Sequence, residues 1–114
     1  MHTVVATPEF LSGARRLLSE EERAELVAHL AGRPDAGALI PGTGGARKLR
    51  WAVGGRGKRG GARVITYYGG PGIPVFLLAI FGKGAKTDMT QAERNELRGV
   101  LGKLAGAYRG SAEQ

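Results

Sequence analysis

The sequence contains no cysteine, and it has few of the residues that most often build catalytic sites. The absence of cysteine excludes a disulfide scaffold and thiolate metal sites, and it is natural in a reducing cytoplasm. His2 and His29 are the only histidines, and Asp35 and Asp88 are the only aspartates. We therefore expect neither a two-histidine acid–base mechanism nor a carboxylate cluster that holds two metal ions.

Long apolar segments are also missing. The longest run covers residues 73–81, far short of the roughly 20 residues that a membrane-spanning helix needs. The N-terminus has no basic segment followed by an apolar one, so no signal peptide is predicted. We expect residues 1–114 to form one domain that is soluble and cytoplasmic, with no membrane partner.

Acidic residues are absent from residues 36–87, although this segment carries nine lysines and arginines. Residues 1–35 contain six acids and four bases, and residues 88–114 contain four of each. The formal net charge of +7 therefore originates in the middle of the chain. Charge of one sign at this density attracts polyanions such as nucleic acids. The nine cations are Arg47, Lys48, Arg50, Arg56, Lys58, Arg59, Arg63, Lys83 and Lys86.

Capping signals and hydrophobic periodicity predict an α+β domain with the element order β-α-α-β-β-β-α. A short strand is expected over residues 3–6, and Thr7 followed by Pro8 marks the beginning of a helix. Residues 19–22 form a capping box that begins a second helix, so these two helices should form a hairpin. A second capping box, at residues 90–93, begins a C-terminal helix.

Three strands separated by glycine-rich turns are predicted between the helices, over residues 47–53, 63–68 and 75–81. In the first of them, Leu49 and Trp51 alternate with Lys48 and Arg50, so one face is apolar and the other is cationic. The third strand is apolar throughout, as in a strand that is covered on both faces. The three strands should form an antiparallel meander.

If the protein cuts nucleic acid, the chemistry has to come from lysine and arginine. Arginine can hold a developing phosphorane with two parallel hydrogen bonds, and a lysine among other cations can exchange a proton. Cleavage of RNA through the ribose 2′-hydroxyl needs a base, charge stabilisation and an acid for the departing 5′ oxygen. Strand alternation and strand order direct four cations toward one end of the sheet: Lys48, Arg50, Arg63 and Lys83.

Several residues have a plainer interpretation. Arg56, Lys58 and Arg59 lie in the turn predicted at residues 54–61, where basic side chains are as often solvated as bound to a ligand. Trp51 is interpreted as a core residue rather than as a platform for a base. His29 is interpreted as structural or solvated.

Two central segments resemble the HigB branch of the RelE/ParE toxin superfamily. They are residues 42–50 (GTGGARKLR) and residues 57–65 (GKRGGARVI), and residues 81–83 and 86–89 after the last strand fit the same branch. The likeness extends over nearly the whole chain. It implies a RelE-like fold, in which a small twisted antiparallel sheet packs against an N-terminal helical hairpin and a C-terminal helix.

The resemblance also implies the toxin of a type II toxin–antitoxin system, a ribosome-dependent endoribonuclease that cuts translated messenger RNA without a metal or other cofactor. The implied partners are messenger RNA, the ribosome and a cognate HigA-like helix-turn-helix antitoxin, with operator DNA bound only through the antitoxin complex. Carried over by motif, the catalytic candidates are Lys48, Arg50, Arg63 and Lys83. The candidates for binding RNA or the ribosome are Arg47, Arg56, Lys58, Arg59 and Lys86.

The chain departs from this family in two places. Residues 84–85 are Gly-Ala where many relatives have Asn-Glu, and the tyrosine that some relatives carry after the last strand has no counterpart at residues 87–90. The general acid and the general base therefore stay unassigned. Two other classes stay open: a ParE-like toxin that inhibits gyrase on DNA, and a non-catalytic module that binds RNA or the ribosome.

Overall fold

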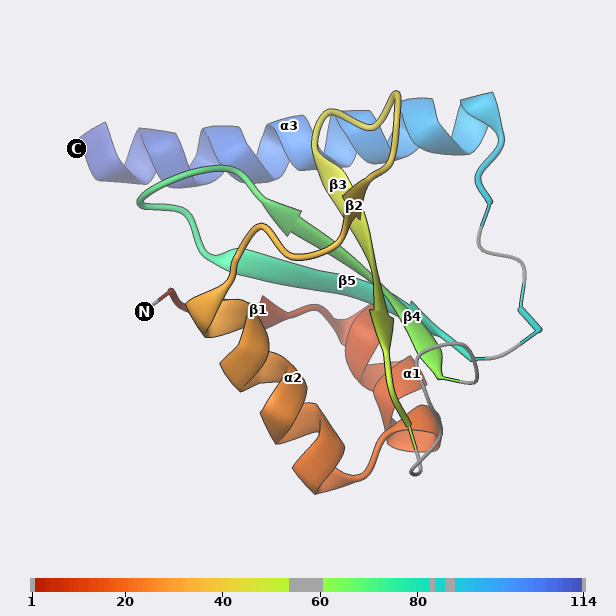
Figure 1. The fold of residues 1–114 in the computed structure, drawn as a ribbon. Coiled ribbons are helices and arrows are strands. Elements are labelled where there is room, and N and C mark those ends of the chain that lie inside the picture. The colour runs from red at the N-terminus through yellow and green to blue at the C-terminus, as the bar shows by residue number, and fades with distance from the viewer. Residues whose placement is uncertain (1, 54–60, 83, 86–87, 114) are drawn as a thin grey trace.

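A computed structural model describes residues 2–53, 61–82, 84–85 and 88–113, with backbone only for residues 109–113. It has an α+β fold, as predicted, in which helices cover both faces of one sheet (Figure 1). The predicted helices and the three central strands are all present; the helices begin, and the strands begin and end, within two residues of the expected positions. In chain order the elements are β1 (Val4–Ala6), α1 (Pro8–Leu17), α2 (Glu20–Gly32), β2 (Ala38–Leu39), β3 (Ala46–Trp51), β4 (Ala62–Tyr68), β5 (Val75–Phe81) and α3 (Gln91–Glu113).

The sheet has five strands in the order β1-β5-β4-β3-β2. The predicted meander of β3, β4 and β5 is antiparallel, and β2 adds to it in the same sense. The sheet as a whole is mixed, and not antiparallel as in the fold that the resemblance implies, because β1 pairs in parallel with β5. The connection between these two parallel strands is long, because α1, α2, β2, β3 and β4 all lie between them in the chain. β2 was not predicted, since two residues are too few to show the alternation that identifies a strand.

The predicted helix starts are confirmed by their hydrogen bonds. The Thr7 hydroxyl accepts from the Phe10 N–H at 3.3 Å and donates to the carbonyl of Leu77 at 2.9 Å, so it both caps α1 and ties it to β5. Ser19 and Glu22 exchange reciprocal hydrogen bonds at the start of α2. Thr90 and Glu93 do the same at the start of α3. These local signals fix where each helix begins.

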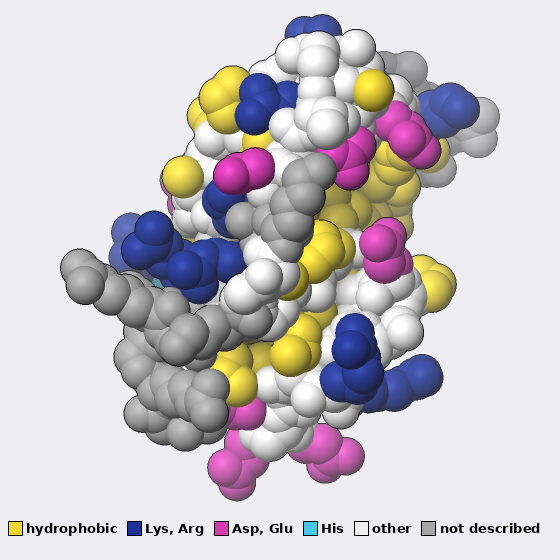
Figure 2. Space-filling model, turned by 90° about the vertical axis from the view of Figure 1, so that its right-hand side faces the viewer, with side chains coloured by type: hydrophobic (Ala, Val, Ile, Leu, Met, Phe, Trp, Pro, Cys, Tyr) yellow, Lys and Arg dark blue, Asp and Glu magenta, His cyan; other side chains and the backbone are white. Residues whose placement is uncertain are grey.

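No helix in the described part of the chain is both long enough and apolar enough to cross a membrane. The longest, α3, has 23 residues and charged side chains along its exposed side. Charged side chains of both signs are spread over the side of the molecule in Figure 2. α3 is therefore a surface helix, and only its inner face packs on the sheet.

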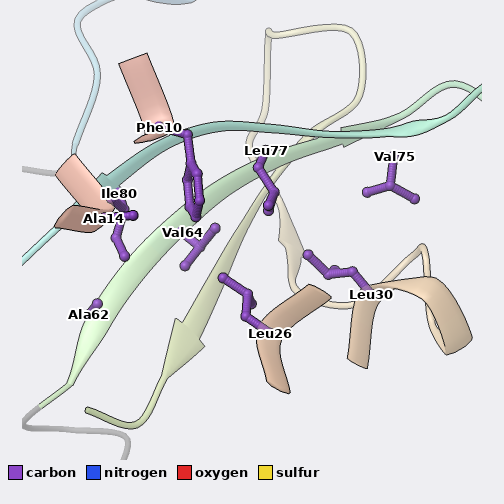
Figure 3. Packing of buried hydrophobic residues seen from close by; sticks show 9 residues of the cluster. All are labelled: Phe10, Ala14, Leu26, Leu30, Ala62, Val64, Val75, Leu77 and Ile80. Carbon is purple, nitrogen blue, oxygen red and sulfur yellow. The ribbon is translucent and has the colours of Figure 1, made fainter. Parts of the chain in front are cut away.

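Two clusters of buried side chains hold the layers together. The first lies between the sheet and the helical hairpin, where Phe10 of α1 and Leu26 of α2 meet Val64 and Leu77 of the sheet (Figure 3). The second lies on the opposite face, under α3, and consists of Ala46, Ile65, Tyr67, Ile73, Phe76, Leu101 and Ala105. β5 contributes to both clusters, so the prediction that this strand is covered on both faces is confirmed.

Close packing of α1 on β5 depends on Gly13. A Cβ at this position would lie 2.8 Å from Ile80 Cγ2 and 3.2 Å from the Ile80 carbonyl oxygen. Gly13→Ala should therefore lower the free energy of unfolding by about 1–3 kcal/mol, the usual cost of overpacking, although alanine is the better helix former. Urea denaturation followed by circular dichroism measures the change.

Gly102→Ala is the matched control, because nothing lies within 4 Å of a Cβ at that position of α3. The same substitution should there raise the free energy of unfolding by about 0.5–1 kcal/mol through helix propensity alone. A stabilised Gly13→Ala protein would contradict the packing described for α1.

Candidate nucleic-acid interface

The register of β3 and β4 brings three cations together. Arg50 pairs directly with Arg63, and Lys48 pairs with Ile65, which is buried under α3. Directly opposed residues share a face of the sheet, as do residues two apart on one strand. Lys48, Arg50 and Arg63, here called the cationic face, therefore lie together on the α3 side of the sheet. Of the four cations predicted to converge at one end of the sheet, these three share a face, and Lys83 lies outside the described residues.

The three cations differ in their surroundings. Arg50 is exposed, while Lys48 and Arg63 are half-buried. Arg63 Nη1 donates a long hydrogen bond of 3.4 Å to the carbonyl of Ala62. Like charges directly opposite each other in an antiparallel pair are destabilising. An anion held between Arg50 and Arg63 would remove that repulsion, so this pair is suited to a phosphate group.

A glycine-rich turn sets the start of β3 and so the register of the cationic face. Gly42, Gly44 and Gly45 have φ angles of 81°, 79° and 126°, which side-chain-bearing residues rarely adopt. Thr43, fully buried between them, donates its hydroxyl to the Ile40 carbonyl at 2.8 Å and accepts from the Ala46 N–H at 3.0 Å. The GTGG sequence thus fixes the residue at which β3 begins.

Lys48 has an acidic neighbour in Asp88. Its Nζ lies 3.7 Å from Asp88 Oδ1, with side-chain exposures of 32% for Lys48 and 93% for Asp88. An ion pair with so exposed a partner contributes little to stability. Asp88 can therefore leave Lys48 when a phosphate approaches.

Sequence reasoning missed Arg94 as a neighbour of Lys48. Both residues line a cavity of about 190 Å³ near the first turn of α3, together with Met89 and Asp88. Charges in residues 88–114 balance, so the charge pattern gave no reason to single out Arg94. Only the position of α3 over the turn at residues 42–45 brings this arginine close to β3.

Other predicted residues do not join the cationic face. Arg47 lies on the opposite face of β3, and its Nη1 donates to the carbonyl of Gly37 at 2.9 Å. That hydrogen bond ties β3 to the segment before β2. The remaining candidates lie outside the described residues: Arg56, Lys58, Arg59, Lys83 and Lys86.

An apolar groove of about 550 Å³ borders the cationic face. Ile65, Phe81 and Val100 are among its apolar lining residues, and its acidic lining residues are Glu9, Glu93 and Glu96. Figure 2 shows hydrophobic side chains in a hollow with acidic side chains beside it, while lysines and arginines gather elsewhere in the view. The groove has three carboxylates and no lysine or arginine among its described lining residues, so it repels the phosphates of a nucleic acid.

The arrangement can bind a phosphodiester through two guanidinium groups and place an amine beside it. Arginine forms paired hydrogen bonds to phosphate oxygens, and lysine acts as a point charge that can exchange a proton. No protein-family model matches this amino-acid sequence. The functional interpretation therefore rests on the geometry and charge of these residues.

Binding of single-stranded RNA should depend on salt through the cationic face. Each phosphate neutralised on a single strand contributes about −0.7 to the slope of log affinity against log salt. The double variant Arg50→Ala/Arg63→Ala should therefore bind a labelled RNA oligonucleotide more weakly, with a slope that is smaller by about 1.4. Fluorescence anisotropy at several salt concentrations measures both quantities.

The control is Arg15→Ala/Arg16→Ala, which removes the same charge from exposed positions at the end of α1. It should leave the slope nearly unchanged. If the two double variants had equal effects, binding would follow net charge alone, and the cationic face would not be a distinct site.

Proposed function

We propose that the protein is the toxin of a type II toxin–antitoxin system and acts as a ribosome-dependent endoribonuclease on translated messenger RNA. The observation that carries this proposal is the direct pairing of Arg50 with Arg63, with Lys48 on the same face of the sheet. The resemblance of residues 42–50 and 57–65 to HigB toxins supports the same activity. Both lines point to RNA phosphate as the group that is bound.

In this proposal, Arg50 and Arg63 hold the non-bridging oxygens of the scissile phosphate. The ribose 2′-oxygen attacks phosphorus, the bond from phosphorus to the 5′ oxygen breaks, and negative charge grows on the oxygens that the guanidinium groups contact. One proton leaves the 2′-hydroxyl and one reaches the departing 5′ oxygen. Lys48 is the described residue of the cationic face that can exchange a proton. The products are a 2′,3′-cyclic phosphate and a 5′-hydroxyl.

Arg63→Ala should lower the rate of messenger RNA cleavage by about 10²–10³, the usual effect of removing one preorganised donor. Arg63→Lys should restore little of the lost cleavage rate, because the point charge of lysine does not reproduce the two parallel hydrogen bonds of arginine. Single-turnover cleavage on purified ribosomes measures the rates, with Arg16→Ala as a control at an exposed cation. Analysis of the product ends should find a 2′,3′-cyclic phosphate.

Two results would contradict this mechanism. One is a 3′-hydroxyl product, and the other is full activity of the Arg63→Ala variant. RNA or ribosome binding without any cleavage would favour the non-catalytic module. Inhibition of gyrase supercoiling by the purified protein would favour the ParE-like alternative.

A free messenger ribonuclease stops the growth of its own host, so the proposal includes a tightly bound antitoxin, expected to be HigA-like. The apolar groove favours an amphipathic antitoxin segment whose apolar side chains are flanked by lysine or arginine. Apolar side chains would fill the groove, and basic ones would meet Glu9, Glu93 and Glu96. Such a segment binds beside the cationic face and leaves its phosphate site uncovered.

Val100→Glu should separate inhibition from toxicity. Val100 lines the groove and is 46% exposed, so a carboxylate there disturbs the groove without burying a charge in the core. Growth arrest should persist, while affinity for the product of the adjacent gene should fall by at least about tenfold, as for a residue inside an interface. Co-expression growth assays and titration of the purified proteins measure the two effects.

Val27→Glu is the matched control, since Val27 is 36% exposed on α2, away from the groove. It should leave both toxicity and rescue intact. Unchanged rescue of the Val100→Glu variant would place the antitoxin elsewhere, and harmless expression of the wild-type chain would oppose the toxin proposal as a whole.

A further inference from the structure

A pocket of about 270 Å³ lies between α2 and the edge of β3, outside the cationic face and the groove. Leu49 and Trp51 reach it from the side of the sheet that faces the helical hairpin. Arg50 also lines it and so joins the pocket to the cationic face. The lining residues are Glu25, His29, Leu49, Arg50, Trp51 and Ala52.

Along the edge of β3 beside this pocket, no strand among the described residues pairs with the backbone beyond Lys48. β2 pairs with β3 at Arg47 and Lys48. The Ala46 carbonyl accepts from the Ile40 N–H at 2.8 Å, so the polar groups of Ala46 point toward β2. Because these groups alternate in direction along a strand, the N–H and C=O of Arg50 also point to the open edge.

The other wall of the pocket is aromatic and acidic. The half-buried Trp51 packs against the core, and its ring lies 5.3 Å from the ring of His29, tilted by 51°. Glu25 is exposed one helical turn before His29, so both side chains face β3 from the same side of α2. The pocket thus combines a rigid aromatic surface, a backbone donor with an acceptor, and a carboxylate.

A planar ring with hydrogen-bonding groups at its edge matches this combination. Proteins that read single-stranded RNA stack bases on aromatic side chains and bond their Watson–Crick edges. A carboxylate only accepts hydrogen bonds, so it selects an edge with two adjacent donors. Guanine, with N1–H and N2–H, has such an edge, whereas adenine, cytosine and uracil do not.

We propose that this pocket is a subsite for one guanine base of single-stranded RNA, with Glu25 as the residue that selects it. The phosphate next to that base then lies at Arg50, at the border of the cationic face. This proposal extends the proposed function. It depends on that function in one respect only, namely that the bound RNA is the RNA that is cleaved. Binding of the base itself needs neither cleavage nor the ribosome.

Trp51 is the single tryptophan of the chain, so its fluorescence reports on the pocket directly. Titration with guanosine 5′-monophosphate should quench it saturably, with an affinity about tenfold or more above those of the adenosine, cytidine and uridine monophosphates, since one bidentate contact is worth about 1–3 kcal/mol. Inosine 5′-monophosphate lacks the N2 amino group, so its affinity should lie between that of guanosine 5′-monophosphate and those of the other three nucleotides.

Glu25→Gln should weaken guanosine 5′-monophosphate binding by about tenfold and remove the preference over the other bases. Glu21→Gln, an exposed substitution one turn earlier on α2, should change neither quantity. Glu25 is exposed, so its substitution does not endanger folding. Equal quenching by all four nucleotides, or unchanged binding in Glu25→Gln, would overturn the subsite.

The outcome is separable from that of the proposed function. Guanine-selective binding without messenger RNA cleavage on ribosomes would keep the subsite and refute the endoribonuclease. Cleavage without guanine selectivity in the mononucleotide titration would keep the endoribonuclease and refute the subsite.

Discussion

The pairing of β3 with β4 is the constraint on which both the core and the cationic face depend. A slip of one residue would turn Lys48 and Arg50 toward the helical hairpin and expose Leu49 and Trp51 to water. The buried charges would be far more costly than the repulsion between Arg50 and Arg63 in the native register. The apolar residues of β3 therefore hold its cations in place. The repulsion between Arg50 and Arg63 persists because burial of Leu49 and Trp51 fixes the register that places the two arginines opposite each other.

The distribution of acids follows from the same arrangement. The segment from residue 36 to residue 87 contains none, and the carboxylates that line pockets or form an ion pair with it are Glu9 of α1, Glu25 of α2, Glu93 and Glu96 of α3, and Asp88 before α3. Among the described residues, the groove under α3 is lined by acidic and not by basic side chains, while Lys48, Arg50 and Arg63 lie on the neighbouring cationic face. A phosphate is attracted to one of these surfaces and a basic peptide to the other, so two different ligands can bind side by side without competing for the same groups.

The sequence predicted the features that depend on neighbouring residues in the chain. It did not predict those that depend on how helices and strands pack against one another. Capping residues and two-residue alternation identified the helices, the central strands and the cationic face. The same alternation puts Arg47 on the opposite face from Lys48, although the charge count grouped them. The parallel pairing of β1 was missed because a strand of three residues carries too little pattern to specify its partner. The position of Arg94 beside Lys48, the groove and the pocket between α2 and β3 depend on how α2 and α3 cross the sheet.

The groove lies next to the cationic face, and this explains how an antitoxin segment in the groove could inhibit the proposed cleavage. Phe81 lines the groove and is the register partner of Arg63, so a segment that fills the groove as far as Phe81 ends beside the phosphate site. Such a segment needs no contact with Arg50 or Arg63 to exclude an RNA held by the ribosome, because its bulk occupies the approach. In this form of inhibition the antitoxin does not contact Arg50 or Arg63, so the proposed catalytic residues need to bind only the RNA phosphate. If the proposed function holds, substitutions in the groove change inhibition by the antitoxin without changing the cleavage reaction.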